Sequence, residues 1–324
     1  MVKAIRIAAY GGPEVMTFET VDVSAPAAGE VRVKHTAIGL NYIDTYHRTG
    51  LYPLAKLPSV IGMEGAGIVT QVGVGVSDVA IGDRVAYANP IGAYAEERLI
   101  PAERLVKIPA GIDDRTAAAM MLQGMTAEYL LRRTFKVGAE TVMLFHAAAG
   151  GVGLIACQWA RALGATIIGT VGSDEKAALA KDAGCTHIIN YRRENFVERV
   201  RELTSGNGCD VVYDGIGKDT YPGSLDCLKP FGLWVSFGNA SGKIEGFDLG
   251  LLAAKGSLFA TRPTLFTYTA KRADLVASAK ALFDVVASGK VKISVNQTYP
   301  LSEAAAAHRD LEARATTGST VLLP

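Results

Sequence analysis

A run of small residues in the middle of the chain could bind a phosphate group. It follows the apolar segment 141–145, and its small positions are Ala148, Gly150 and Gly153. Glycine at such a turn lets the backbone approach a pyrophosphate, while the first amides and the dipole of a following helix favour negative charge. Since Ala148 stands where the usual pattern has glycine, the flanking elements have to support the prediction.

Those flanking elements are a buried strand and an amphipathic helix. Segment 141–145 is apolar after Thr141, as a buried strand is, and the residues after the turn place apolar side chains at helical spacing. These side chains are Val152, Ile155, Ala156, Trp159 and Leu163. We therefore predict a dinucleotide-binding turn with contacts from Ala148, Gly150, Gly151 and Val152. The alternative is a glycine turn that only packs a helix against a sheet.

The residues after the next predicted strand, 165–171, indicate which dinucleotide binds. An NAD site usually carries Asp or Glu about 20 residues past the glycine turn, where it accepts hydrogen bonds from the ribose hydroxyls. Here Gly172, Ser173 and Lys176 bring amides, a hydroxyl and an ammonium to that place. These groups suit a 2′-phosphate, so we expect NADPH.

Other side chains near this segment bear on the same prediction. Tyr191 follows the third predicted strand and could close over the 2′-phosphate, with an arginine of the pair 192–193 nearby. A structural explanation stays open, because Asp174 and Glu175 would complement the dipole of a helix that starts there. Lys176 would then be an ordinary residue of the helix surface.

Length and composition define the broad class of protein. The chain has 324 residues, more than one compact core usually supports, so two domains are expected. A formal net charge of +1 provides no long-range field that would attract nucleic acid or an anionic membrane. The scattered cysteines suggest neither a disulfide framework nor a metal knuckle: Cys157, Cys185, Cys209 and Cys227. No signal-peptide pattern or membrane-spanning run is found, so a reducing, cytoplasmic location is expected.

The hydrophobic pattern divides the chain into a β-rich part and an alternating part. The first third has short β-branched runs separated by Gly and Pro, which predicts a small, mostly β domain. Helices 115–123 and 126–135 follow, and strands and helices then alternate, which predicts a doubly wound parallel sheet. Its six strands are expected at 141–145, 165–171, 186–190, 209–213, 232–237 and 256–261.

The C-terminal tail has a different pattern and is expected to rejoin the β domain. It is predicted to contain helix 270–288, strand 294–299, helix 302–314 and strand 320–323. The expected domains are therefore 1–122 with 263–324, and 123–262.

Four further motifs occur in order before the glycine turn: Gly11-Gly12-Pro13-Glu14, Gly39-Leu40-Asn41-Tyr42-Ile43-Asp44, Gly62-Met63-Glu64-Gly65-Ala66-Gly67 and Gly82-Asp83-Arg84-Val85. Together with that turn they resemble the medium-chain dehydrogenase/reductase superfamily, and most closely its zeta-crystallin-like NADPH:quinone oxidoreductases. The resemblance extends over essentially the whole chain. It implies an α/β protein with a GroES-like β-rich catalytic domain, a Rossmann domain with a doubly wound parallel sheet, and a cleft where nicotinamide meets substrate.

The chain departs from the zinc alcohol dehydrogenases of that superfamily at two ligand positions. Where those enzymes carry a Cys and a His on the catalytic zinc, this chain has Asn41 and Met63. Neither an amide nor a thioether is a usual zinc ligand. Without a Lewis acid the site suits acceptors that take hydride readily, such as quinones and conjugated enones. We expect no metal.

The expected activity is direct hydride transfer from NADPH to a quinone, with the protein supplying orientation and hydrogen bonds. The resemblance places Asn41 at the active cleft, where its amide would contact the nicotinamide ribose or the substrate. Its alternative role is to cap the turn that Asp44 continues. Tyr46 and Tyr52 flank the quinone side by resemblance and could donate to a quinone oxygen, although either could instead be a core aromatic residue.

The resemblance also suggests further cofactor contacts. Thr126, at the start of a predicted helix, would contact the nicotinamide, or would only be an N-cap. Arg314 would approach the adenosine phosphate, or would only be solvated. His146 is interpreted as structural. The remaining expected contacts are Asp44, Ile216, Phe237, Gly238, Asn239, Thr261 and Arg262.

Two predictions concern partners and alternative functions. The sixth strand and segment 234–243 should lie at an apolar sheet edge, so we expect a homodimer formed through the nucleotide domains. Reduction of 2-alkenals or other enones would need the same cofactor geometry and a proton donor near the α-carbon. A structural or RNA-binding role, known among zeta-crystallin relatives, is the less favoured alternative. The near-neutral charge and the absence of a basic, aromatic-interleaved stripe argue against nucleic acid as a main partner.

Overall fold

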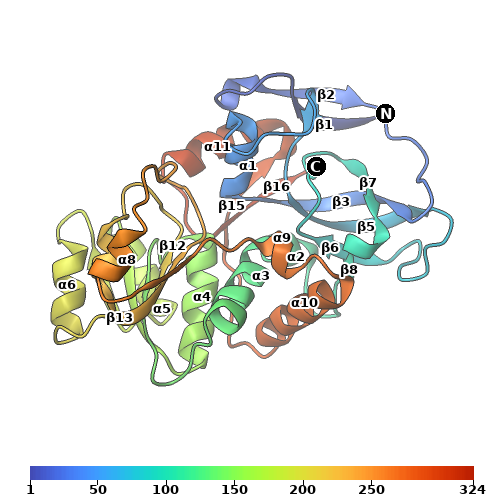
Figure 1. The fold of residues 1–324 in the computed structure, drawn as a ribbon. Helices are drawn as coiled ribbons and strands as arrows, with labels where there is room; N and C mark the ends of the chain where they lie inside the picture. The colour runs from blue at the N-terminus through green and yellow to red at the C-terminus, as the bar shows by residue number, and fades with distance from the viewer. The chain divides into compact units, whose positions relative to one another are not determined.

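Strands from distant parts of the sequence form the sheets of the first of two units. In the computed structural model, which describes all 324 residues, this β-rich unit consists of Met1–Met125, Thr269–Ala287 and Ile293–Pro324. Its larger sheet has the order β15-β16-β3-β5-β6-β8, with β7 also paired to β3, and its smaller sheet has the order β2-β1-β4 (Figure 1).

The strands of this unit are β1 (Val2–Ile7), β2 (Met16–Val21), β3 (Glu30–Leu40), β4 (Ser59–Val60), β5 (Glu64–Val72), β6 (Arg84–Tyr87), β7 (Glu97–Pro101), β8 (Val106–Lys107), β15 (Val295–Pro300) and β16 (Ser319–Leu323). Alternate apolar residues of the long strand β3, such as Val31 and Val33, are buried in one core. β16 pairs antiparallel with β3, so the C-terminal tail completes this sheet.

Short helices flank these sheets: α1 (Tyr42–Thr49), α2 (Asp114–Ala118), α10 (Arg272–Ala287) and α11 (Ala304–Glu312). The sequence analysis did not predict α1, β2 or β7. α1 begins directly after β3, with Asn41 as its N-cap, and Gly50 ends it in the left-handed conformation at φ 81°. This helix fixes the direction in which Asn41 leaves the sheet.

The second unit contains the predicted parallel sheet. It consists of Thr126–Tyr268 and Ser288–Lys292, and we call it the nucleotide unit. Its strands are β9 (Val142–Phe145), β10 (Thr166–Val171), β11 (His187–Asn190), β12 (Cys209–Asp214), β13 (Leu228–Ser236) and β14 (Phe259–Thr261). They are all parallel and have the order β11-β10-β9-β12-β13-β14. This is the doubly wound order that the fold prediction required.

The helices of the nucleotide unit are α4 (Gly151–Ala162), α5 (Asp174–Asp182), α6 (Phe196–Leu203), α7 (Gly223–Asp226), α8 (Gly250–Ala254) and α9 (Leu265–Tyr268). Apolar residues of the strands, among them Leu144, Ile168 and Val212, are buried together with Trp234. No helix of the structure is long and apolar enough to cross a membrane.

Two local predictions were wrong. Thr126 does not begin a helix, because it lies inside α3 (Met121–Tyr129), which continues into a π-helix at Leu130–Thr134. An N-cap role for Thr126 is therefore excluded. β13 is not an edge strand either, because it lies between β12 and β14, and only β14 forms that edge of the sheet. Sequence periodicity identifies a strand but not its neighbours.

Candidate functional site

The expected nucleotide contacts lie at the carboxyl ends of the parallel strands. Ala148, Gly150, Gly151 and Val152 follow β9, whereas Gly172, Ser173 and Lys176 follow β10. Tyr191 follows β11, Ile216 follows β12, Phe237, Gly238 and Asn239 follow β13, and Thr261 and Arg262 end or follow β14. Since all six strands are parallel, these residues share one edge of the sheet, where doubly wound folds bind their ligands.

The glycine turn brings β9 into α4 by a close approach of backbone atoms. Gly150 is the N-cap of α4, and Ala147 has a positive φ of 54°. A Cβ on Gly153 would lie 2.4 Å from the carbonyl oxygen of Ala147, so only glycine fits there. Ala148 is fully buried, and its amide donates to the Thr170 carbonyl on β10. The first amides of α4 lack intrahelical partners, as at any helix N-terminus.

A buried carboxylate, Asp214, orders the loop after β12. Its Oδ1 accepts hydrogen bonds from the backbone N–H groups of Ile216 and Gly217, at 2.9 and 3.1 Å, and its Oδ2 accepts one from the Ser224 hydroxyl at 2.8 Å. Burial alone would raise the pKa of Asp214, but His146 and these donors, with Thr220, hold it below the ordinary value. Asp214 was not among the expected site residues. The pattern that could have identified it is an Asp at the end of a strand, directly before Gly-x-Gly.

His146 lies on the neighbouring strand end and is part of the same arrangement. Its Nδ1 lies 3.0 Å from the Thr170 hydroxyl and its Nε2 lies 3.1 Å from the Ser224 hydroxyl. Burial lowers the pKa of the imidazole, and the ring is 2% exposed. His146 therefore links the ends of β9 and β10 to α7.

The place expected for a 2′-phosphate is built from the start of α5. Ser173 is the N-cap of this helix and accepts a hydrogen bond from the Lys176 amide. The phenol oxygen of Tyr191 lies only 2.5 Å from where a Cβ on Gly172 would be, so Tyr191 covers this glycine. Asp174 forms an exposed ion pair with Arg193 at 2.8 Å. Of the two acids in the first turn of α5, Asp174 and Glu175, Asp174 is therefore already paired.

The loop after β13 approaches the loop after β12 very closely. The Phe237 amide donates to the Asp214 carbonyl, and a Cβ on Gly238 would lie 2.3 Å from the Gly215 carbonyl oxygen. Arg262 donates to the Ser236 carbonyl at 2.8 Å. Backbone packing therefore holds these two loops together at the strand ends.

The remaining expected residues lie in the β-rich unit, and Asn41 is the most constrained of them. Its Nδ2 donates to Glu64 Oε2 at 2.6 Å, its Oδ1 accepts from Gln123 Nε2 at 3.2 Å, and the side chain is 4% exposed. The Asn41 amide nitrogen of the backbone donates to Asp44 Oδ2 at 2.9 Å. Sequence analysis did not single out Glu64 or Gln123 as partners.

Asp44 is fully buried and supports Asn41 from inside the unit. Besides Asn41 it accepts a hydrogen bond from the Tyr94 hydroxyl, which also lies 3.0 Å from His308 Nε2. His308 Nδ1 lies 3.0 Å from Arg48, and burial lowers the pKa of this histidine to about 3, so the ring is neutral. A row of hydrogen bonds thus leads from the Arg48 guanidinium to Asp44.

Both carboxylates beside Asn41 favour the protonated state. Burial raises the pKa of Glu64 from 4.5 to about 8, and the charge of Asp44 adds to the effect. Burial likewise raises the pKa of Asp44 from 3.8 to about 7. Each carboxyl retains hydrogen bonds to protein donors, but these are too few to offset the loss of water.

Tyr46 and Tyr52 lie together at the end of α1. Their rings meet edge to face at 5.2 Å, and the Tyr52 amide donates to the Tyr46 carbonyl. Tyr46 is 8% exposed, whereas Tyr52 is half-buried. Arg314 follows α11 with a positive φ of 60°. The structure thus places the expected residues in two groups, one in each unit.

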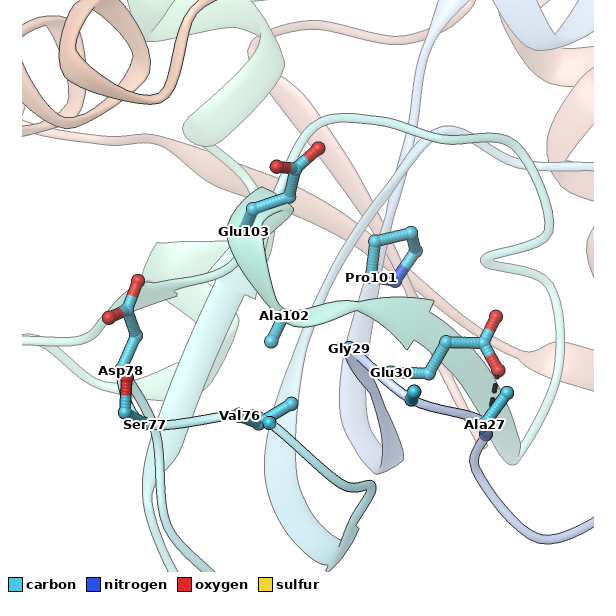
Figure 2. Close-up of a pocket in the computed structure, with 11 residues that line it drawn as sticks. Ala27, Gly29, Glu30, Val76, Ser77, Asp78, Pro101, Ala102 and Glu103 are labelled. Atoms are coloured by element: carbon cyan, nitrogen blue, oxygen red, sulfur yellow. Dashed lines mark hydrogen bonds between the residues drawn. The ribbon is translucent and has the colours of Figure 1, made fainter.

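A depression of about 540 Å³ in the β-rich unit contains none of the expected site residues. Residues 27–30, 75–78 and 101–103 line it. Figure 2 shows the carboxylates of Glu30, Asp78 and Glu103 around it, and the hydrogen bond from the Ala27 amide to Glu30. Asp78 and Glu103 form ion pairs with Arg272 and Arg104, so these acids are engaged with the protein itself.

Comparison with known families matches each unit separately. Residues 27–110 match the alcohol dehydrogenase GroES-like domain, and residues 151–282 match the family described as zinc-binding dehydrogenase. A GroES-like part followed by a doubly wound nucleotide unit is the architecture of the medium-chain dehydrogenases/reductases. No group of three or more His, Cys, Asp or Glu side chains is placed to hold a metal ion.

Several known proteins are similar to this chain over its whole length. The chain is 55% identical to a quinone oxidoreductase of Pseudomonas aeruginosa and 50% identical to quinone oxidoreductase 1 of Escherichia coli, each over the whole of both chains. The crystal structure of the Escherichia coli quinone oxidoreductase complexed with NADPH matches with a TM-score of 0.98 at 50% identity, covering 99% of this chain and 100% of that one. A 2-haloacrylate reductase of Burkholderia is also 50% identical, over 100% of this chain and 99% of its own. The chain belongs to the quinone oxidoreductase family and is an oxidoreductase.

The raised pKa values make the stability of the β-rich unit depend on pH. The folded state holds the Glu64 proton more tightly than the unfolded chain does. Binding of this proton therefore stabilises the folded state fully below pH 4.5, and this stabilisation is lost as the pH rises through 8. We expect the Tm to fall between pH 5 and pH 9, and the variant Glu64→Gln to remove several degrees of that fall. Thermal unfolding followed by circular dichroism at each pH measures this.

The matched control is Glu103→Gln, because Glu103 is an exposed carboxylate of the same unit. Its pH dependence should follow that of the unaltered protein. A Glu64→Gln profile that is parallel to the unaltered one would contradict the assignment.

Proposed function

We propose that this protein catalyses metal-independent hydride transfer from NADPH to a quinone. The observation that supports it best is that the residues expected to contact a nucleotide follow parallel strands at one sheet edge, around the N-terminus of α4. Relatives named quinone oxidoreductase, and a structural neighbour complexed with NADPH, support the same activity.

The donor chemistry beside Asn41 supports the metal-independent interpretation. Met63 is buried and offers only a thioether, and both ends of the Asn41 amide are hydrogen-bonded to Glu64 and Gln123. Zinc prefers thiolate, imidazole and carboxylate ligands. A carbonyl to be reduced would therefore be polarised by hydrogen bonds rather than by a Lewis acid.

The residues of the nucleotide unit fit a phosphorylated dinucleotide. We assign the pyrophosphate to the amides of Gly150, Gly151 and Val152, behind which Ala148 packs. The 2′-phosphate is assigned to Gly172, Ser173, Lys176 and Tyr191, with Arg314 of the β-rich unit as a further contact. The contacts assigned to the nicotinamide half are Thr126, Ile216, Phe237, Gly238, Asn239, Thr261 and Arg262.

The catalytic task of the β-rich unit is orientation and hydrogen bonding. NADPH, when bound, supplies the hydride. Asn41 donates to the nicotinamide ribose or to the substrate, and Asp44 acts through Asn41, since Asp44 is fully buried. Tyr46 and Tyr52 cover one face of the quinone and donate to the oxygen that gains charge.

Reduction of an activated carbon–carbon double bond is the second candidate. A relative that is 50% identical is named 2-haloacrylate reductase, and the crystal structure of a 2-haloacrylate reductase matches with a TM-score of 0.88. Both reactions require hydride delivery from the same cofactor. They differ because reduction at carbon also requires a proton donor near the α-carbon of the substrate.

A substrate panel separates these candidates. NADPH and NADH oxidation by the purified protein would be followed with benzoquinones, naphthoquinones, 2-alkenals, 2-haloacrylates and simple ketones, with and without a chelator. We expect quinones to give the highest kcat/KM with NADPH and the chelator to have no effect. Inhibition by the chelator, or a preference for alcohols as hydride donors, would contradict the proposal.

Lys176 tests the cofactor preference. The variant Lys176→Ala should raise the KM for NADPH by roughly tenfold and leave the KM for NADH unchanged, because only NADPH carries the phosphate that the ammonium would meet. Steady-state kinetics with both cofactors measure the difference. Lys181→Ala, on the last turn of the same helix, is the control. Equal effects of Lys176→Ala on both cofactors would refute the assignment.

We further propose that two copies associate through the nucleotide unit. β14 is an edge strand, and apolar side chains nearby are exposed: Phe231, Leu249 and Phe259 are 71%, 71% and 60% exposed. An unprotected apolar edge favours pairing with another strand. Sedimentation at micromolar concentration should show a dimer, and Phe259→Lys should shift it to a monomer. A monomeric unaltered protein would remove this claim.

A further inference from the structure

Four buried polar side chains form a single row in the β-rich unit. They are Glu64 at the start of β5, Asn41 at the N-cap of α1, Gln123 on α3 and Ser319 at the start of β16. Their residues are 0%, 4%, 7% and 2% exposed. Four separate elements thus contribute one polar group each to a place where every hydrogen bond must be satisfied within the protein.

The row has a definite hydrogen-bond geometry. Glu64 Oε1 accepts from the Leu122 amide at 2.8 Å, and Oε2 lies 2.6 Å from Asn41 Nδ2. Asn41 Oδ1 lies 3.2 Å from Gln123 Nε2, and Gln123 Oε1 lies 2.8 Å from the Ser319 hydroxyl. That hydroxyl also lies 2.9 Å from the carbonyl oxygen of Ala119.

The charge of Glu64 determines the direction of this row. An ionised carboxylate can only accept hydrogen bonds, so Asn41 must turn its nitrogen toward Glu64 and its oxygen toward Gln123. Gln123 must then turn its nitrogen toward Asn41, and the Ser319 hydroxyl donates to the Gln123 oxygen. The second N–H of Asn41 is left on the Glu64 side.

A protonated Glu64 allows the reverse direction. Glu64 would donate to Asn41 Oδ1, the Asn41 nitrogen to the Gln123 oxygen, and the Gln123 nitrogen to Ser319. The Ser319 hydroxyl would then donate to the Ala119 carbonyl, which lies within reach. Every polar group is satisfied in this direction too, but the Asn41 nitrogen now lies on the Gln123 side.

We propose that Glu64 is a positioning residue, which acts with Gln123 and Ser319 to hold the Asn41 amide in the orientation that presents its N–H for the hydride-transfer reaction. This inference rests on the proposed role of Asn41 as a donor to the nicotinamide ribose or the substrate. It extends that role by identifying what determines the orientation of the donor.

The surroundings of Glu64 make both protonation states accessible near neutral pH. Burial raises the pKa of Glu64 to about 8. Asp44 on α1 faces it and adds negative charge, and the hydroxyls of Tyr87 and Tyr94 interact with it electrostatically. From α3 the backbone amides of Met121 and Leu122 hydrogen-bond to it, and on Gly39 of β3 a Cβ would lie 2.5 Å from Glu64 Oε2.

The variant Glu64→Gln tests the proposal because it imposes the reverse direction without a cavity. The carbonyl of the introduced glutamine can accept from Leu122, and its nitrogen then faces Asn41, as the protonated acid would. We expect a folded protein whose kcat/KM with NADPH and quinone falls by roughly tenfold or more. In the unaltered enzyme kcat/KM should rise with pH as Glu64 ionises, and this rise should be absent in Glu64→Gln.

A double variant distinguishes a loss of activity caused by the orientation of the Asn41 amide from a loss caused by lower stability of the fold. In the double variant Asn41→Asp with Glu64→Gln, the carboxylate and the amide trade places, so every hydrogen bond of the row can form again. The side chain at position 41 then has no N–H to donate. We expect the Tm to match the unaltered value and the activity to stay low. Recovery of activity together with the Tm would overturn the proposal.

Two further variants complete the experiment. Asp114→Asn replaces a carboxylate of the same unit that binds Arg84 and Thr36, and it should leave kcat/KM and its pH profile unchanged. Ser319→Ala removes the last hydroxyl of the row. It should lower kcat/KM less than Glu64→Gln does and should likewise weaken the rise of kcat/KM with pH. If the unaltered protein reduces quinones but Glu64→Gln keeps its kcat/KM and pH profile, only this inference fails. If the unaltered protein reduces no quinone, the proposed function fails first.

Discussion

A carboxylate that is removed from water must gather hydrogen bonds or give up its charge, and both units of this protein are organised around that constraint. In the nucleotide unit the buried group is Asp214, and in the β-rich unit it is Glu64. Both sit at the end of a strand, one at the carboxyl end of β12 and one at the start of β5. Each accepts hydrogen bonds from residues that are expected to contact the cofactor or the substrate, Ile216 in one unit and Asn41 in the other.

The two carboxylates meet the constraint in opposite ways. Asp214 accepts from two backbone amides and from the hydroxyls of Ser224 and Thr220, and its pKa stays below the ordinary value. Because Asp214 stays charged and accepts several hydrogen bonds, it holds the loop after β12 in one conformation. Glu64 accepts hydrogen bonds from backbone amides of α3 and from the Asn41 side chain, but these do not offset its burial, so its pKa rises. A group that titrates near neutrality can change the direction of the hydrogen bonds around it.

Such a contrast suits a dehydrogenase that transfers hydride without a bound metal. The dinucleotide needs a fixed cradle, and the loops tied together by Asp214, His146 and Gly238 would provide one. The reacting groups need donors whose orientation is set in advance, because preorganised hydrogen bonds stabilise developing charge at no cost of rearrangement. A side-chain amide held at both ends, as Asn41 is, meets that requirement.

Local patterns in the sequence were sufficient to predict the doubly wound sheet, the glycine turn and the helices after its strands. Strand periodicity, helix periodicity and the steric needs of a turn act over a few residues, so they can be recognised without a structure. Thr126 shows the limit of such local prediction. A break between two helices was expected before Thr126, but α3 continues from Met121 to Tyr129. Segment 234–243 shows it too, because the part of it that belongs to β13 lies inside the sheet and not at the expected edge.

What the tertiary structure alone decided is the set of partners for the buried polar groups. Glu64 and Leu122 are 58 residues apart, and Gln123 and Ser319 are 196 residues apart, yet each pair shares a hydrogen bond. No local pattern links such residues, because their meeting depends on how β5, α3 and β16 pack. The sequence by itself determined the parallel sheet and the glycine turn, and that Asn41 stands where the zinc alcohol dehydrogenases carry a zinc ligand. Packing decided that Asn41 is held by a buried acid, since burial is a property of the whole unit and not of any segment.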